Sequence, residues 1–122
     1  MLELLLFKLV EARNLLVDRD DRFYAWASAE LDRVVALVRD AELKRAMIVS
    51  GEKTLADIAA TAPAPFGTIL DDHREQLRRV LTEIESARDT SCHLARTAAF
   101  DSQALTAATC ELSLASLADF LA

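Results

Sequence analysis

The sequence has few of the residues that most catalytic and secreted folds depend on. Its 122 residues include 2 glycines, 2 prolines, 2 cysteines, 2 histidines and only 6% aromatic residues. Two glycines cannot build the glycine-rich loops that hold dinucleotides or nucleotide phosphates. The scarcity of turn-forming and aromatic residues also disfavours a sheet architecture. The rest of the composition is 52% apolar, mainly leucine, alanine and valine, and it favours helices within one domain.

An excess of basic charge is also missing. The chain has 14 basic and 20 acidic side chains, a formal net charge of -6, so phosphate backbones and anionic lipids would be repelled. Residues 54–60 and 68–70 superficially resemble a helix-turn-helix, but Asp71 and Asp72 stand where DNA would need basic side chains. Because no long apolar run or cleavage site indicates membrane insertion or secretion, we expect a cytoplasmic protein that binds no nucleic acid.

Catalytic motifs are not found in the sequence. It contains no HExxH, no GxSxG and no Glu-x-x-His pair of the di-iron type. His73 and His93 are interpreted as packing or capping residues. Cys92 adjoins His93, but neighbouring helical residues point about 100° apart, so the two cannot form a nucleophile–base pair. We expect Cys92 and Cys110 to be reduced core residues, and we expect no enzyme activity, no cofactor and no metal.

Apolar periodicity predicts three long helices. Residues 2–17 are apolar around most of a helical wheel, and such a helix must be covered by neighbours. A second helix is predicted over about 21–50 and a third over about 68–94, and their seams are expected to pack as an antiparallel pair. The seam residues are Tyr24, Ala27, Leu31, Val34, Val38, Ala41 and Ile48 in the second helix, and Leu70, His73, Leu77, Val80, Ile84, Ala87 and Leu94 in the third.

The segments between these helices carry local start and stop signals. Residues 18–21 provide N-cap candidates for the second helix, and Gly51 is suited to end it. Thr54 followed by Asp57 predicts a capping box that opens a short helix over 55–60. Residues 63–67 contain both prolines and cannot be helix interior. The sequence therefore predicts an all-α, elongated antiparallel helical bundle of three long helices plus a short connecting helix.

The C-terminal end places six large apolar side chains in a short stretch with few charges. They are Leu105, Leu112, Leu114, Leu117, Phe120 and Leu121. Something must cover them, either the other helices or a partner protein. Residues 97–109 are rich in alanine, threonine and serine and offer few packing anchors, which favours a C-terminal segment 105–122 that can detach and bind a partner helix. Packing of the same residues into the core is the open alternative.

Five stretches, in this order, resemble the FlgN family of flagellar export chaperones, particularly its actinobacterial members. They are residues 4–9 (LLLFKL), 39–46 (RDAELKRA), 55–59 (LADIA), 62–66 (APAPF) and 69–74 (ILDDHR). The resemblance spans about residues 4–95 of the single domain 1–122, and the tail after Arg96 lies outside it.

The resemblance implies a cytosolic chaperone of type III export. Such a chaperone holds the helical terminal segments of hook-associated proteins of the FlgK and FlgL type and delivers them to an export gate component of the FlhA type. A helical adaptor or structural interaction module is the alternative. An adaptor should keep its apolar tail packed without a partner, whereas a chaperone should leave part of it exposed. The sequence leaves open whether the protein is a monomer or a homodimer.

Overall fold

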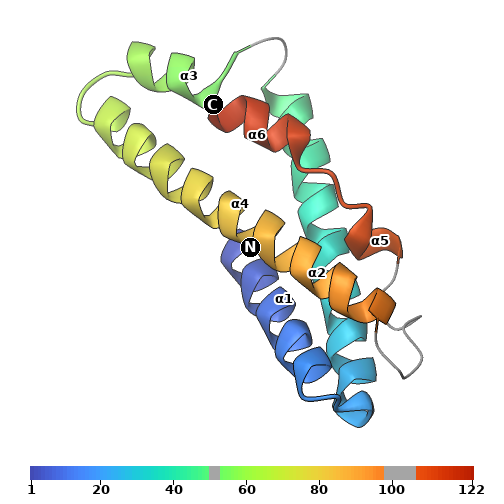
Figure 1. Ribbon diagram of the computed structural model, residues 1–122. Coiled ribbons are helices and arrows are strands. Elements are labelled where there is room, and N and C mark those ends of the chain that lie inside the picture. The colour runs from blue at the N-terminus through green and yellow to red at the C-terminus, as the bar shows by residue number, and fades with distance from the viewer. Residues whose placement is uncertain (50–52, 98–106) are drawn as a thin grey trace.

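The computed structural model describes residues 1–49, 53–97 and 107–122, and all regular structure in these ranges is helical. The helices are α1 (Leu2–Val17), α2 (Asp21–Ile48), α3 (Leu55–Thr61), α4 (Phe66–Thr97), α5 (Ala107–Cys110) and α6 (Ala115–Leu121), shown in Figure 1. The all-α prediction is confirmed for the described residues. Two short C-terminal helices, α5 and α6, add to the three long helices and the connecting helix that were predicted.

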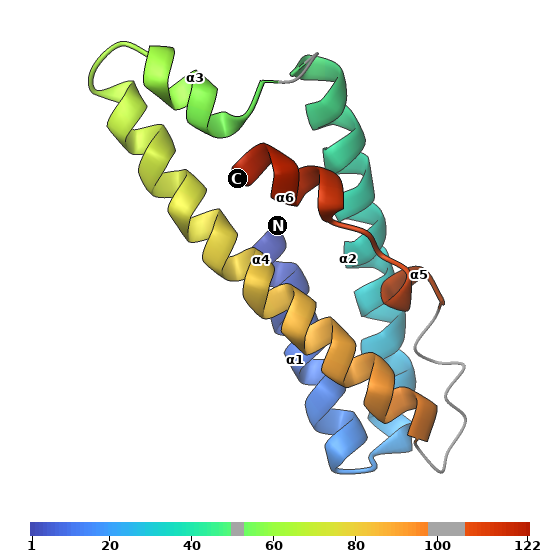
Figure 2. The same ribbon diagram turned by 45° about the horizontal axis from the view of Figure 1, so that its top comes forward.

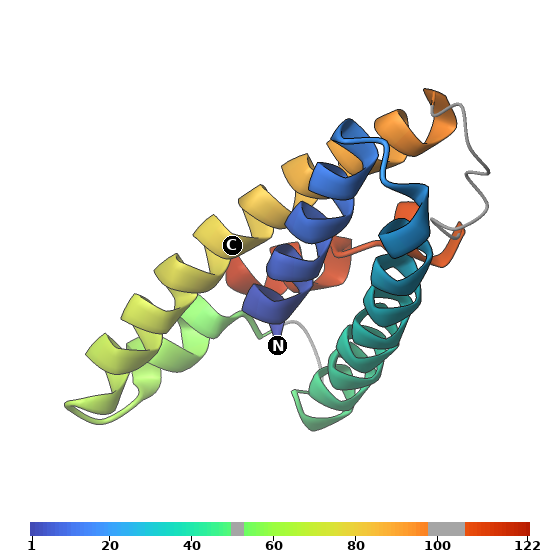
Figure 3. The same cartoon turned by 90° about the horizontal axis from the view of Figure 1, so that it is seen from below.

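Helix α1 is the centre of the fold. It has the predicted bounds and buries four side chains, Leu5, Leu9, Ala12 and Leu16. It packs against both α2 and α4, as Figure 3 shows. A helix that is apolar on several sides can pack against two neighbouring helices at once, which is why α1 occupies the central position.

A tight turn joins α1 to α2. Arg19 adopts a left-handed conformation with φ of 54°. The Asp20 carboxylate then accepts a hydrogen bond from the Phe23 backbone N–H at 3.2 Å, so one of the predicted N-cap candidates caps α2. Further along the hairpin, the Lys8 ammonium contacts the Glu30 carboxylate at 2.6 Å. This hydrogen bond raises the pKa of Lys8 and joins the two antiparallel helices near their middle.

The prediction that the second and third long helices form a side-by-side pair is wrong. Helices α2 and α4 run in opposite directions, but α1 lies between them and they diverge toward the end that carries α3 (Figures 1 and 2). In the described residues they make at most marginal direct contact. The two predicted seams therefore meet α1 and not each other. Beyond the reach of α1 the seams are open, so Ile48 and His73 are exposed.

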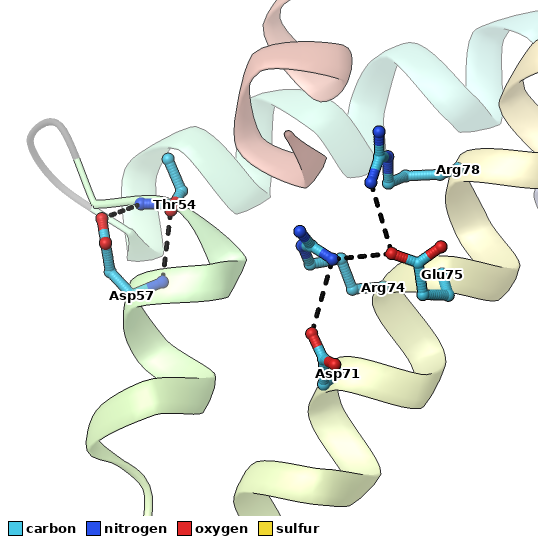
Figure 4. A network of polar contacts seen from close by, with 6 residues as sticks. All are labelled: Thr54, Asp57, Asp71, Arg74, Glu75 and Arg78. Carbon is cyan, nitrogen blue, oxygen red and sulfur yellow. Dashed lines mark hydrogen bonds and ion pairs between the residues drawn. The ribbon is translucent and has the colours of Figure 1, made fainter.

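The predicted capping box opens α3. The Thr54 hydroxyl accepts from the Asp57 N–H at 3.2 Å, and the Asp57 carboxylate accepts from the Thr54 N–H at 3.1 Å (Figure 4). This backbone hydrogen bond holds the pKa of Asp57 below its usual value. Two of the backbone N–H groups that lack an intrahelical partner at the start of the helix are thereby satisfied.

Helix α4 begins at Phe66, two residues earlier than predicted. The Phe66 N–H donates to the Pro63 carbonyl at 2.9 Å, and the Ile69 N–H donates to the Pro65 carbonyl at 3.3 Å. A proline at the start of a helix costs no hydrogen bond, because its N–H would have no intrahelical partner there. The neighbouring Gly67 is in close contact with α3: a Cβ atom at this position would lie 2.7 Å from the Ala59 carbonyl oxygen.

The C-terminal helices fill the opening between α2 and α4. Helix α5 contacts α2 and α4, whereas α6 contacts α4 and α3. The expectation that the two cysteines are reduced is wrong for this structure, since a disulfide joins Cys92 of α4 to Cys110 of α5 across a Cα–Cα distance of 5.9 Å. No pattern in the sequence indicates this bond, because the two residues are 18 positions apart and become neighbours only through tertiary packing. Among the described helices, none combines the length and apolarity needed to span a bilayer.

Candidate protein-binding surfaces

The predicted partner-binding residues of the tail lie mostly in the core. Leu112, Leu114, Leu117 and Leu121 are buried, Phe120 is half-buried, and Leu105 lies outside the described residues. The four buried leucines therefore pack in the core, which is the alternative that the sequence left open. A partner-binding role for these leucines stays a prediction, and it would require the tail to detach.

Several polar or covalent ties hold the tail in place, among them the Thr109 hydroxyl, which donates to the Asp32 carboxylate at 3.4 Å, and three further contacts. The Arg88 guanidinium donates to the Leu112 carbonyl at 2.6 Å. Arg45 donates to the Ser116 hydroxyl at 3.0 Å, and its guanidinium lies 4.5 Å from the centre of the Phe120 ring. The Cys92–Cys110 disulfide is the third of these further contacts. These contacts link residues far apart in the chain, so no local pattern in the sequence could have indicated them.

A shallow hollow lies between α2 and the start of the tail. It has a volume of about 330 Å³, and its lining includes buried Val38, Leu112 and Leu114 together with exposed Leu43. Two of the predicted partner-binding residues thus border accessible space even though they are packed. The hollow is smaller than the groove described next.

The apolar stripe of α4 is covered along only half of its length. From the middle of the helix onward, Leu81, Ile84 and Ala87 are buried, and Ile84 is 0% exposed. In its N-terminal half the same stripe continues, but Phe66 is 58% exposed and Ile69 is 45% exposed. Figure 3 shows the reason: α1 lies along the C-terminal half of α4 and stops near its middle.

Three half-buried residues of the same stripe, Leu70, Leu77 and Val80, form the floor of a groove, which we call the α4 groove. It has a volume of about 580 Å³. It is lined by Met1, Leu2, Glu3, Leu55, Leu70, His73, Gln76, Leu77 and Val80. Helix α4 provides the floor, the first turn of α1 closes one end, and Leu55 at the start of α3 forms a wall. Three elements therefore build the groove: α4, the first turn of α1 and the start of α3.

The charge of the α4 groove is set by very few groups. Among the side chains of the described residues that line it, the Glu3 carboxylate is the one that is charged at neutral pH, and Met1 beside it carries the α-amino group. On the side of α4 toward α3 and α6, charged side chains engage one another (Figure 4). Arg74 contacts Glu75 at 2.8 Å, and Arg78 contacts the same carboxylate at 3.3 Å. The groove is thus apolar with one anionic position at its α1 end.

The described ranges contain no cluster of side chains suited to hold a metal ion. Within residues 1–49, 53–97 and 107–122, no group of three His, Cys, Asp or Glu side chains is placed to hold a metal ion. His73 is an exposed lining residue of the α4 groove instead of a packed seam residue, and His93 is also exposed. No protein-family model, no characterised protein and no solved structure matches the chain.

Proposed function

We propose that the protein holds an amphipathic helix of a partner protein in the α4 groove. The observation that carries this proposal is the apolar stripe of α4, which is packed beneath α1 in one half and open in the other. Helix-in-groove recognition uses apolar anchors spaced three, four and seven residues apart. Leu70 and Leu77 are seven residues apart on the groove floor, and Val80 follows three residues later.

The packing of α1 supports a helix as the occupant. A helix already lies on the covered half of the stripe, so the side chains of α4 present a surface of the right shape for another along the same line. Each leucine-sized side chain buried there would contribute about 1.5–3 kcal/mol before ordering costs. Two or three such anchors would bind the partner helix and still allow its release.

The charge at the end of the groove favours a particular kind of helix. Glu3 would complement a lysine or arginine that flanks the apolar face of the partner. The chain as a whole has a net charge of -6, which also favours a basic partner segment. The proposed occupant is therefore an amphipathic helix with a basic flank.

In its specific form, the proposal is a cytoplasmic chaperone of type III flagellar export. The clients would be terminal segments of hook-associated proteins of the FlgK and FlgL type, and the loaded complex would be delivered to an export gate component of the FlhA type. The five ordered stretches that resemble the FlgN family support this form, and the all-helical fold and open groove are compatible with it. We propose the α4 groove as the client site, and a role for the buried tail leucines stays a separate prediction.

The buried tail favours a second candidate, a helical adaptor. An adaptor is expected to keep its apolar tail packed without a partner, and Leu117 and Leu121 are packed in this way. An adaptor and a chaperone could use the same groove, but an adaptor would hold its partner permanently. Release of the bound segment upon addition of the export-gate component distinguishes the two.

The test compares one groove variant with one matched surface variant. Leu77→Ser removes a floor residue, whereas Val17→Ser removes an exposed apolar side chain at the other end of the molecule. Titration calorimetry with a terminal fragment of a hook-associated protein should show at least tenfold weaker binding for Leu77→Ser, with Val17→Ser like the wild type. Equal affinities would exclude the groove as the site.

A basic amphipathic peptide of unrelated sequence completes the experiment. If the wild type binds this peptide but no hook-associated fragment, the general proposal that the groove binds amphipathic helices is supported, and the flagellar chaperone proposal is wrong. If it binds neither, both the general and the specific proposals fail. Circular dichroism of each variant checks that the helical content is unchanged.

A further inference from the structure

The outer face of α2 presents apolar side chains that no described element covers. Leu37 is 52% exposed and Met47 is 82% exposed. Between them lie Asp40 and Lys44, whose side chains form an ion pair at 2.8 Å on the same face. The spacings of three, four and three residues place all four side chains on one side of the helix, opposite the buried seam that contains Val35 and Val38.

We propose that this face pairs with the same face of a second copy of the chain, with the two α2 helices antiparallel. The order Leu37, Asp40, Lys44, Met47 has the same apolar–charged–charged–apolar form from either end. A two-fold axis near Glu42 therefore sets Leu37 against the second copy's Met47 and Asp40 against the second copy's Lys44. Such self-complementarity is what an isologous interface requires.

Charge complementarity selects a second copy over an unrelated partner. Across the two-fold axis, each carboxylate would meet an ammonium group of the other chain, so two ion pairs become one alternating cluster of four charges. Between Leu37 and Met47 the charges of Asp40 and Lys44 on this face cancel. The net charge of -6 on each chain is thus not concentrated where the two chains would meet.

Apolar contacts would flank this cluster on both sides. Leu37 and Lys44 are seven residues apart, as are Asp40 and Met47, so the face repeats at the heptad spacing of paired helices. Each half of the interface would bury one leucine and one methionine, and the adjacent Ile48 is exposed and available to extend the contact. The α4 groove is formed by other elements, so this dimer does not rest on the proposed function.

Charge substitutions test the pairing between chains. Wild type should sediment at twice the 13.4 kDa chain mass at high micromolar concentration. Asp40→Lys alone and Lys44→Asp alone each place like charges opposite one another in a homodimer, and each should weaken dimerisation at least tenfold. An equimolar mixture of the two variants should restore the dimer, because both intermolecular contacts then join opposite charges.

Restoration in the mixture is the outcome that a purely intramolecular effect could not produce. Both variants lose the Asp40–Lys44 pair within their own helix, so circular dichroism must show that each is folded. The variant Met47→Ser keeps the charges and removes an exposed apolar side chain, and it should also weaken the dimer. A monomeric wild type, or a mixture that stays monomeric, would overturn the proposal.

Discussion

The two halves of α4 carry one continuous apolar stripe, yet only one half is covered. Helix α1 has 16 residues and α4 has 32. At the helical rise these lengths correspond to about 24 Å and about 48 Å, so α1 can cover only half of the stripe. The periodicity of α4 therefore determines which of its faces is apolar, whereas the length of α1 determines how much of that face is buried.

The largest expected difference between the halves concerns stability. Ile84→Ala in the covered half should lower the free energy of unfolding by about 2–5 kcal/mol, because the site is fully buried and a cavity would remain. Ile69→Ala in the open half should cost about 1 kcal/mol or less, because this side chain is 45% exposed. Urea denaturation of both variants gives the comparison. Equal losses would show that the N-terminal half is covered in solution.

The second prediction concerns the disulfide at the covered half. Removal of the Cys92–Cys110 bond by a dithiol reductant should lower the free energy of unfolding by about 3 kcal/mol, because the bond closes a loop with a sequence separation of 18. The double variant Cys92→Ser/Cys110→Ser should behave like the reduced protein and should not respond to the reductant. The cytoplasm keeps thiols reduced, so the reduced form is the one relevant to the proposed location. Peptide binding in the α4 groove should be the same in both redox states.

The third prediction uses Tyr24, the one tyrosine in the chain, as a reporter of the covered end. Burial, aided by the negative charge of Asp32, raises the pKa of Tyr24 from 10.0 to about 12. Ultraviolet titration should therefore detect ionisation near pH 12 in the folded protein and near 10 in urea. Because the unfolded chain loses its proton first, the stability present below pH 10 should fall by about 2–3 kcal/mol as the pH rises through the folded pKa. An apparent pKa near 10 without denaturant would contradict the packing of this end.

The smallest expected effect concerns the wall of the open half. Thr54→Ala removes the hydroxyl of the α3 capping box and should lower stability by about 1 kcal/mol, with Thr54→Ser as the control that keeps the hydroxyl. The pKa of Asp57 is depressed in the fold, so the capping contribution should be present at neutral pH and lost as the pH falls through that pKa. Chemical denaturation at pH 7 should show this loss for Thr54→Ala and not for Thr54→Ser, because only the alanine variant lacks the hydroxyl that accepts from the Asp57 N–H.

The parts of the fold that could be predicted from the sequence are those that short-range interactions determine. The bounds of α1, the cap at Asp20 and the capping box of Thr54 and Asp57 all depend on groups within a few positions of one another. The start of α4 was misplaced by two residues because prolines are permitted in a first helical turn as well as in a loop. Local chemistry is readable from a single sequence to about this precision.

The arrangement of the helices and the position of the groove could not be predicted in this way. The seams of α2 and α4 are equally compatible with packing on each other and with packing on α1, so periodicity did not reveal that α1 lies between them. The burial of Leu117 and Leu121 depends on α6 entering the opening between the long helices. The groove floor at Leu70 and Leu77 was recognised as a seam, and only the length of α1 shows that this part of the seam lacks a covering helix.

The close approach at Gly67 has a consequence for the breadth of what the protein can hold. A single methyl group at this position would meet the Ala59 carbonyl oxygen at 2.7 Å, so any other residue would act as a spacer between α3 and α4. Since Leu55 on α3 forms one wall of the groove, a spacer at position 67 would tilt that wall relative to its floor. The width of the groove, and with it the size of the side chains that fit inside, therefore depends on the absence of a side chain at Gly67.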